Sequence, residues 1–148
     1  MREIVFRGKR RDTGEWVEGY FVHCKSEWEE ERVAEIIPPE TDRIYRGEYD
    51  LYDVHEVDSV TVGQFTGLTD KNSTRIFEGD IVDIDIGYLK RRGVVFCEES
   101  AAKFGLEMEG AEKNFSFLGR QMVKMYNVTV IGNIHDNPEL IGERKDNG

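Results

Sequence analysis

The sequence predicts a mainly β protein, either all-β or α+β, with at most one or two short helices. Three observations support this class. Apolar residues alternate with charged ones in several short runs, turn-prone Gly, Asp and Asn residues separate these runs, and Ile, Val, Phe and Tyr are abundant enough to fill a core. At 148 residues the chain has the size of one ordinary domain. We therefore expect a single domain over residues 1–142 and a frayed tail over 143–148.

The amino-terminal region predicts an opening β-hairpin. Ile4 and Phe6 alternate with charged residues, and the alternation resumes in EWVEGYFVH after the turn-prone Asp12-Thr13-Gly14. Basic residues gather around the predicted loop, beside an aromatic residue that could stack on a nucleic-acid base. The candidate binding residues are therefore Arg7, Lys9, Arg10, Arg11 and Trp16. The alternative interpretation is a solvated strand and turn face with ordinary β-core aromatics.

The next segment is acidic and allows two interpretations. Ser26 followed by Glu29 fits a helix capping box, whereas Val33, Ile36 and Ile37 lead directly into Pro38-Pro39, which favours an extended chain. We predict an acidic loop followed by a strand that ends at Pro38. Residues 40–58 are polar and aromatic, and we expect a long excursion with one short element.

The central tract, VGQFTGLTDKNSTRIFEGDIV, is the most organised part of the sequence. It predicts a strand over 62–68, a turn over 69–74 and then an alternating strand that begins near Ile81 and ends at Gly87. A basic turn at 90–92 and a returning strand at 93–97 complete a hairpin of the kind used in small SH3-like barrels. The prediction is therefore a barrel-like, SH3-like antiparallel sheet, with further apolar segments at 115–118, 122–125 and 128–134.

No pattern in the sequence indicates a catalytic residue, a metal site or a cofactor. Asp80, Asp83 and Asp85 lie in a strand pattern, so we interpret Asp80 as a turn or cap residue and the other two as the solvent face. The three histidines are far apart, and the two cysteines form no C-x-x-C motif.

The net charge of −10 gives a field that repels duplex DNA and anionic lipid at long range, so we expect no membrane partner. The first residues, MREIVFRGKRR, place charge where a signal peptide has its apolar core. No apolar run approaches the ~20 residues needed to span a bilayer. A cytoplasmic protein is expected.

Three stretches together resemble the YopX-like family of small bacteriophage and prophage proteins: MREIVFRGKR, the central tract, and VIGNIHDNPELI near the end. Ser73 stands where this family usually has glycine, which predicts a longer or different turn because serine tolerates positive φ poorly. The resemblance implies a β-rich accessory protein in the cytoplasm of a bacterial host, with no enzymatic activity to carry over. The residues assigned to the structural motif are Gly63, Gln64, Phe65, Thr66, Gly67, Asp70, Glu78, Gly79 and Asp80.

Three hypotheses for function follow. The first is a non-enzymatic interaction module that binds a host or phage protein. The second is a nucleic-acid-associated module that uses the basic hairpin loop. The third is an acidic decoy that presents the glutamates of residues 27–35 to a basic protein. Open β-sheet edges also predict a homo-oligomer.

Overall fold

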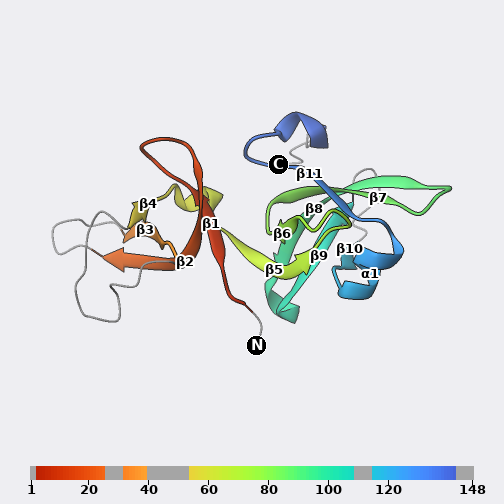
Figure 1. The fold of residues 1–148 in the computed structure, drawn as a ribbon, viewed down its shortest axis with the longest axis horizontal. Coiled ribbons are helices and arrows are strands. Elements are labelled where there is room, and N and C mark those ends of the chain that lie inside the picture. The colour runs from red at the N-terminus through yellow and green to blue at the C-terminus, as the bar shows by residue number, and fades with distance from the viewer. Residues whose placement is uncertain (1–2, 26–31, 40–53, 109–114, 143–148) are drawn as a thin grey trace. The chain divides into compact units, whose positions relative to one another are not determined.

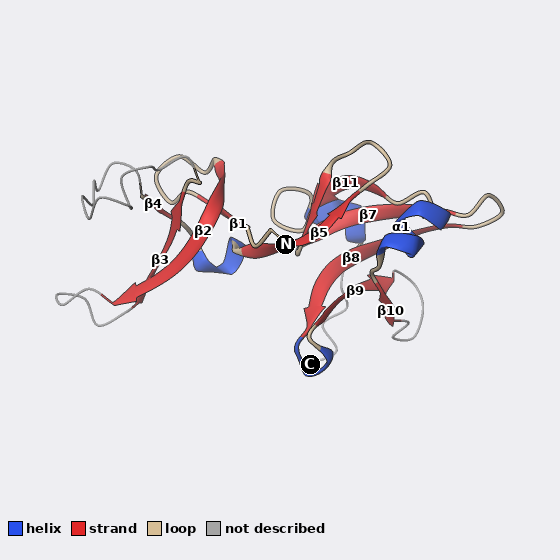
Figure 2. Ribbon diagram, turned by 60° about the horizontal axis from the view of Figure 1, so that its bottom comes forward, coloured by secondary structure: helices blue, strands red, loops and turns tan. Residues whose placement is uncertain are grey.

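A computed structural model of the chain describes residues 3–25, 32–39, 54–108 and 115–142 (Figure 1). Within these residues the protein has eleven strands in two antiparallel sheets, one short α-helix and several short 3-10 turns. Figure 2 shows how completely strands dominate the regular structure. The predicted mainly β class is therefore confirmed.

The chain divides into two compact units, Met1–Phe65 and Thr66–Gly148, called here unit 1 and unit 2. Strand β5 (Gly63–Thr69) begins in unit 1 and continues into unit 2. The assignment of residues 1–142 to one domain stays a prediction. The tail over 143–148 lies outside the described residues.

Unit 1 is built on the predicted opening hairpin, which is confirmed. Its strands follow the order β4-β3-β2-β1-β5 within the first sheet. In the hairpin, Lys9 lies opposite Trp16 and Arg7 opposite Glu18. The bounds of the strands are β1 (Phe6–Lys9), β2 (Trp16–Lys25), β3 (Arg32–Ile37) and β4 (His55–Glu56).

Strand β3 forms where the sequence favoured an extended chain ahead of the prolines. Ala34 and Ile36 of this strand pack with Val57 in a small core, and Val17 and Phe21 contact its margin. The acidic residues 27–31 and most of the predicted excursion, residues 40–53, lie outside the described residues. The described remainder of the excursion contains the two-residue strand β4.

Unit 2 holds the second sheet, in the order β10-β9-β8-β7-β11, and β6, which pairs with β5. One core joins the sheet to the helix α1: Ile84, Val95 and Leu106 pack with Val123 of the helix and with Val128. The bounds are β6 (Arg75–Phe77), β7 (Asp80–Asp85), β8 (Lys90–Glu98), β9 (Lys103–Met108), β10 (Phe115–Phe117), α1 (Arg120–Met125) and β11 (Thr129–Asn133).

The expected barrel-like closure is not present among the described residues, where both sheets remain open. Strand β11 shows a physical reason. The side chain of Asp70 accepts the N–H of Val130, and the side chain of Asn137 accepts the N–H of Asn133, so these two donors are not available to a further strand. An SH3-like arrangement stays a prediction.

The predicted basic turn at 90–92 is wrong, because these three residues begin β8. The chain reverses earlier, where the N–H of Ile86 donates to the carbonyl of Leu89 over 3.0 Å. Gly87 provides the left-handed backbone that this tight turn needs, with φ of 88°. The shift places Lys90 opposite Asp85 and Arg92 opposite Asp83. Opposite charges thus face each other across the hairpin.

Candidate functional site

The predicted binding residues of the opening hairpin lie together in unit 1, and each has a partner there. The guanidinium carbon of Arg7 lies 4.7 Å from the centroid of the Trp16 ring, and the ammonium of Lys9 lies 5.7 Å from it. Both distances are those of cation–π contacts. The indole ring of Trp16 is therefore already engaged by cations of its own chain.

The other two basic residues of this hairpin form ion pairs. Arg10 donates two hydrogen bonds to Asp12, at 2.9 and 2.7 Å, and Arg11 contacts Glu56 at 3.1 Å. The hydrogen bond from Arg10 holds the pKa of Asp12 below its usual value, and the same bond raises the pKa of Arg10. The positive charges of Arg10 and Arg11 are therefore compensated within unit 1.

Asp70, in the turn of the central tract, serves the backbone. It is 6% exposed, and its Oδ1 accepts the N–H groups of Asn72 and Thr74 at 2.8 and 2.9 Å. Its Oδ2 accepts the N–H of Val130 at 2.9 Å. One carboxylate therefore fixes the turn and ties it to β11.

Ser73 in the same turn adopts φ of 64°, so serine takes the left-handed conformation for which glycine is better suited. The longer or different turn expected from the family comparison stays a prediction. The N–H of Ser73 donates to the carbonyl of Asp70, and the N–H of Asp70 donates to the carbonyl of Thr74. The hydrogen bonds of Asp70 hold the serine in this conformation.

The remaining signature residues also lie in structural positions. Asp80 is 1% exposed and accepts the N–H of Phe77 at 2.7 Å, while the adjacent Gly79 has φ of 88°. The hydroxyl of Thr66 donates to the carbonyl of Ile76 at 2.8 Å. Five further residues lie in β5 or in the turn between β6 and β7: Gly63 and Phe65 are buried, Gln64 and Glu78 are half-buried, and Gly67 is exposed with φ of 85°.

A second turn, from the carboxyl-terminal signature, is centred on Asn133. Its Oδ1 accepts the N–H groups of His135 and Asp136, at 3.0 and 2.9 Å, and its Nδ2 donates to the Asp136 carboxylate at 3.1 Å. These polar residues, like Asp70, determine the path of the chain.

The described part of the chain holds neither a metal centre nor an activated thiol at Cys97. No three His, Cys, Asp or Glu side chains there lie close enough together to hold a metal ion. Burial, with the nearby carboxylate of Glu78 next in effect, raises the pKa of Cys97 and disfavours its thiolate.

Among the described helices, none combines the length and the apolar character required to cross a membrane.

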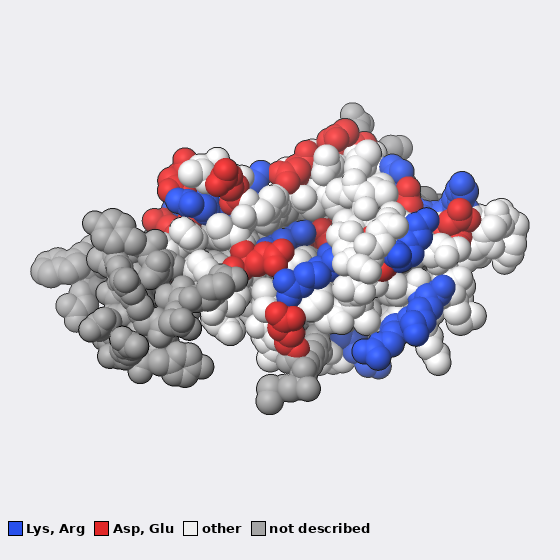
Figure 3. All heavy atoms as spheres, in the orientation of Figure 1, with Lys and Arg blue, Asp and Glu red and all other residues white. Residues whose placement is uncertain are grey.

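A groove of about 560 Å³ lies on unit 2, along the polar face of β11, β7 and β8. We call it the charged groove. Its volume falls within the ~300–1,000 Å³ of ordinary ligand sites. It is lined by Lys71, Asp83, Ile84, Asp85, Lys90, Arg91, Arg92, Asn127, Thr129 and Ile131. In Figure 3, Lys and Arg side chains gather over the right-hand part of the view, where Figure 1 places β7, β8 and α1.

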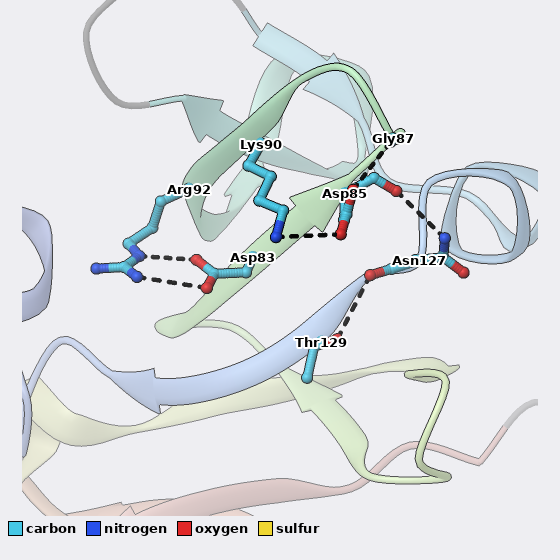
Figure 4. A network of polar contacts seen from close by, with 7 residues as sticks. All are labelled: Asp83, Asp85, Gly87, Lys90, Arg92, Asn127 and Thr129. Atoms are coloured by element: carbon cyan, nitrogen blue, oxygen red, sulfur yellow. Dashed lines mark hydrogen bonds and ion pairs between the residues drawn. The ribbon is translucent and has the colours of Figure 1, made fainter.

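The firmest contact in the charged groove joins Arg92 to Asp83 (Figure 4). Arg92 Nε lies 2.7 Å from one carboxylate oxygen and Nη2 lies 3.3 Å from the other, a two-point contact. The remaining nitrogen, Nη1, donates to the carbonyl of Leu140 at 2.9 Å. Arg92 thus connects the hairpin to the end of the described chain.

A looser network surrounds Asp85, nearer the hairpin tip. Lys90 Nζ lies 3.7 Å from its carboxylate, and the N–H of Gly87 donates to that carboxylate at 2.9 Å. The Gly87 hydrogen bond and, after it, the charge of Lys90 lower the pKa of Asp85. Asn127 Nδ2 donates to the Asp85 carbonyl at 3.3 Å, and the Thr129 hydroxyl donates to the Asn127 carbonyl at 3.4 Å (Figure 4).

The charged groove has a net positive charge although the chain carries −10. On the groove face, the three cations of Lys71, Lys90 and Arg92 lie beside the carboxylates of Asp83 and Asp85, which leaves +1. Arg91 also borders the groove, but its side chain emerges on the other face of the hairpin. Lys90 keeps 79% of its side chain exposed, so its ammonium can reach a bound anion. The groove therefore suits an anionic group held beside fixed carboxylates.

Exposed apolar side chains lie at the tip of the same hairpin. Tyr88 is 92% exposed and Leu89 is 37% exposed. At the end of α1, Met125 and Tyr126 are 70% and 36% exposed. Tyrosine, methionine and arginine are residue types enriched at protein interfaces.

Sequence reasoning did not find this site, because it placed residues 90–92 in a turn. One signal was available. Asp83 and Asp85 are two residues apart on one strand, and Lys90 and Arg92 have the same spacing on the next. A reversal centred on Gly87 aligns the two pairs on one face.

Fold and site together define a mainly β protein of two open antiparallel sheets with a charged groove on one hairpin. The chain belongs to the YopX family, since the family model described as YopX protein matches residues 5–142.

Comparison with curated protein sequences gives no significant match. Among solved structures, the chain is similar to the crystal structure of protein EF1440 from Enterococcus faecalis. The TM-score is 0.47 at 22% sequence identity, and the alignment covers 95% of this chain and 99% of that one.

Proposed function

We propose that this chain is a phage or prophage accessory protein that acts as a non-enzymatic protein-interaction module in the bacterial cytoplasm. One observation carries the proposal: the β7–β8 hairpin presents exposed apolar residues at its tip directly beside the charged groove. The family resemblance supports the phage or prophage origin. The partner is a host or phage protein.

The chemistry of the hairpin supports a protein partner with an acidic contact surface. Interfaces depend on a few aromatic and arginine side chains surrounded by polar contacts, and Tyr88 and Arg91 are residues of these types. Lys71, Lys90 and Arg91 favour a negatively charged partner, because complementary charge speeds encounter and fixes orientation. The carboxylates of Asp83 and Asp85 would then select against a partner that presents unpaired acids at those positions.

The nucleic-acid hypothesis is weaker as a second candidate. Its five candidate residues have cation–π or ion-pair partners within unit 1. A bound phosphate or base would have to displace these partners.

Self-association through open sheet edges remains part of the proposal. Light scattering tests it by measuring the molecular mass of the protein in solution.

Site-specific photo-cross-linking tests the proposed function. A photoreactive phenylalanine analogue replaces Tyr88 in one variant and Val60 in a matched control; Val60 is 78% exposed but lies in unit 1. Both variants are expressed in a bacterial host that carries the parent phage or prophage. We expect a discrete cross-linked protein from position 88 only. Equal products from both positions, or none from position 88, would contradict the proposal.

A further inference from the structure

A second, apolar pocket lies on unit 2 between the β7–β8 hairpin and α1. Its volume is about 190 Å³. We call it the apolar pocket. The apolar side chains that line it are Ile84, Ile86, Leu89, Met108, Met122 and Tyr126. Arg91 completes the lining as its one charged residue.

The apolar pocket is the hairpin end of the hydrophobic core of unit 2. Ile84 belongs to this core, and Ile86, Met108 and Met122 pack against it while remaining half-buried. Leu89 and Tyr126 lie at the more exposed side. The described residues thus leave apolar surface open to solvent at the end of the core. Burial of such surface by a partner is favourable, because it removes apolar area from water.

The size of the pocket suits one side chain. An engineered apolar cavity of about 150 Å³ is known to hold a benzene molecule, so about 190 Å³ accommodates an aromatic ring or a branched aliphatic group. The two methionines, Met108 and Met122, can adjust to the shape of the guest because their side chains are unbranched and flexible.

Arg91 gives the pocket a charge preference. It lies opposite Ile84 in the hairpin register, so it emerges on the face opposite that of Lys90 and Arg92. Those two neighbours are paired with Asp85 and Asp83. Among the described residues, the exposed Arg91 side chain has no hydrogen bond or ion pair. Its guanidinium is therefore available to a carboxylate.

We propose that the apolar pocket receives one apolar side chain of a partner protein, and that a carboxylate next to this side chain pairs with Arg91. This inference rests on the proposed function and specifies its partner: a segment in which an aromatic or branched aliphatic residue adjoins an acidic one. The positive charge of Arg91, which is available to a carboxylate, favours a partner segment that carries an acidic residue.

A probe that combines both features tests the proposal without the partner. The full chain is labelled with ¹³C at its methionine methyl groups and titrated, in NMR experiments, with 3-phenylpropionate. The uncharged 3-phenylpropan-1-ol provides the comparison. We expect the Met108 and Met122 signals to move while the signal of Met125, outside the pocket lining, stays in place. The dissociation constant should be on the order of 1 mM, and the alcohol should bind about fivefold more weakly.

Arg91→Gln should abolish the preference for the carboxylate and retain weak binding of both probes. Lys124→Gln is the matched control, because it removes an exposed cation of α1 that lines neither the apolar pocket nor the charged groove, and it should keep the preference. A thermal melt of each variant confirms that it folds.

Three results would overturn the proposal: unchanged Met108 and Met122 signals at 10 mM probe (roughly tenfold above the expected constant), equal affinities for the two probes, or a preference that survives Arg91→Gln. Movement of the same signals upon dilution of the protein alone would assign the pocket to a second copy of the chain and also overturn it. Cross-linking at position 88 tests the proposed function separately, so the two can fail independently.

Discussion

Both units carry basic residues at a β-hairpin, and they use them differently. In unit 1, Arg10 and Arg11 pair with Asp12 and Glu56, while Arg7 and Lys9 lie against Trp16. In unit 2, Lys90 and Arg92 line the charged groove, and Arg91 lines the apolar pocket on the other face of the hairpin. A dense cluster of charge in a sequence therefore does not itself define a site. The pairing register decides which charges face internal partners and which remain available.

Removal of Asp70 should destabilise the turn and the β11 contact that position one side of the charged groove. Asp70→Ala leaves the N–H groups of Asn72, Thr74 and Val130 without their acceptor, and we expect a loss of about 3 kcal/mol in the free energy of unfolding. Urea denaturation measures it. Asp12→Ala is the matched control in unit 1, since Asp12 lies on an exposed loop, and its unfolding midpoint should hardly change. Equal effects of the two substitutions would contradict this contrast.

The two kinds of arginine pair can be compared directly. The Arg92 side chain is 32% exposed and makes a two-point contact with Asp83, whereas the Arg11 side chain is 67% exposed. Arg92→Ala should cost about 1.5 kcal/mol of stability, and Arg11→Ala should stay within about 0.5 kcal/mol. Chemical denaturation of both variants at the same ionic strength measures these losses of stability. A larger loss for Arg11→Ala than for Arg92→Ala would contradict the stronger role assigned to the Arg92 contact.

The turn that carries Lys71 into the charged groove contains the left-handed Ser73. Ser73→Gly relieves the unfavourable backbone conformation but adds freedom to the unfolded chain, so we expect a net gain of about 0.5 kcal/mol. The midpoint of thermal unfolding should rise. Ser59→Gly offers a control at an exposed serine in unit 1 without positive φ, and it should not stabilise the protein. A lower midpoint of thermal unfolding for Ser73→Gly would show that the serine backbone is not strained.

The smallest effect concerns the titration of Asp85. Its pKa lies below the ordinary value of 3.8 because of the Gly87 N–H and the charge of Lys90. A carboxylate with a lowered pKa in the folded state contributes stability that is lost as the pH falls through that pKa. Lys90→Gln should therefore raise the pKa of Asp85 part of the way towards 3.8, as NMR titration of the carboxyl carbon can follow. An unchanged pKa would contradict the contribution of Lys90 and leave the shift to the Gly87 N–H and the charge of Lys71.

Much of the fold could be predicted from local patterns. The opening hairpin and strand β7 follow from alternation, and β3 follows from the prolines after it, because each of these signals lies within a few residues. Closure into a barrel depends on pairing between distant strands. The local sequence did not show that Asp70 and Asn137 would occupy N–H groups of β11.

The site was harder to predict for the same reason. Arg7, Lys9 and Trp16 were expected near one another, and the structure places them together. Their internal contacts could not be foreseen, since they depend on the exact strand register. The charged groove was missed because a shift of three residues in the position of one turn converts Lys90 and Arg92 from loop residues into cross-strand partners of β7.

The most direct test of the account compares two variants that each lose two positive charges. Lys71→Gln with Lys90→Gln alters the charged groove, and Arg10→Gln with Arg11→Gln alters the unit 1 loop. Isothermal titration against the partner cross-linked at position 88 should show at least about tenfold weaker binding for the groove variant and less than about a twofold change for the loop variant. The opposite order would contradict the assignment of the interaction surface to the β7–β8 hairpin.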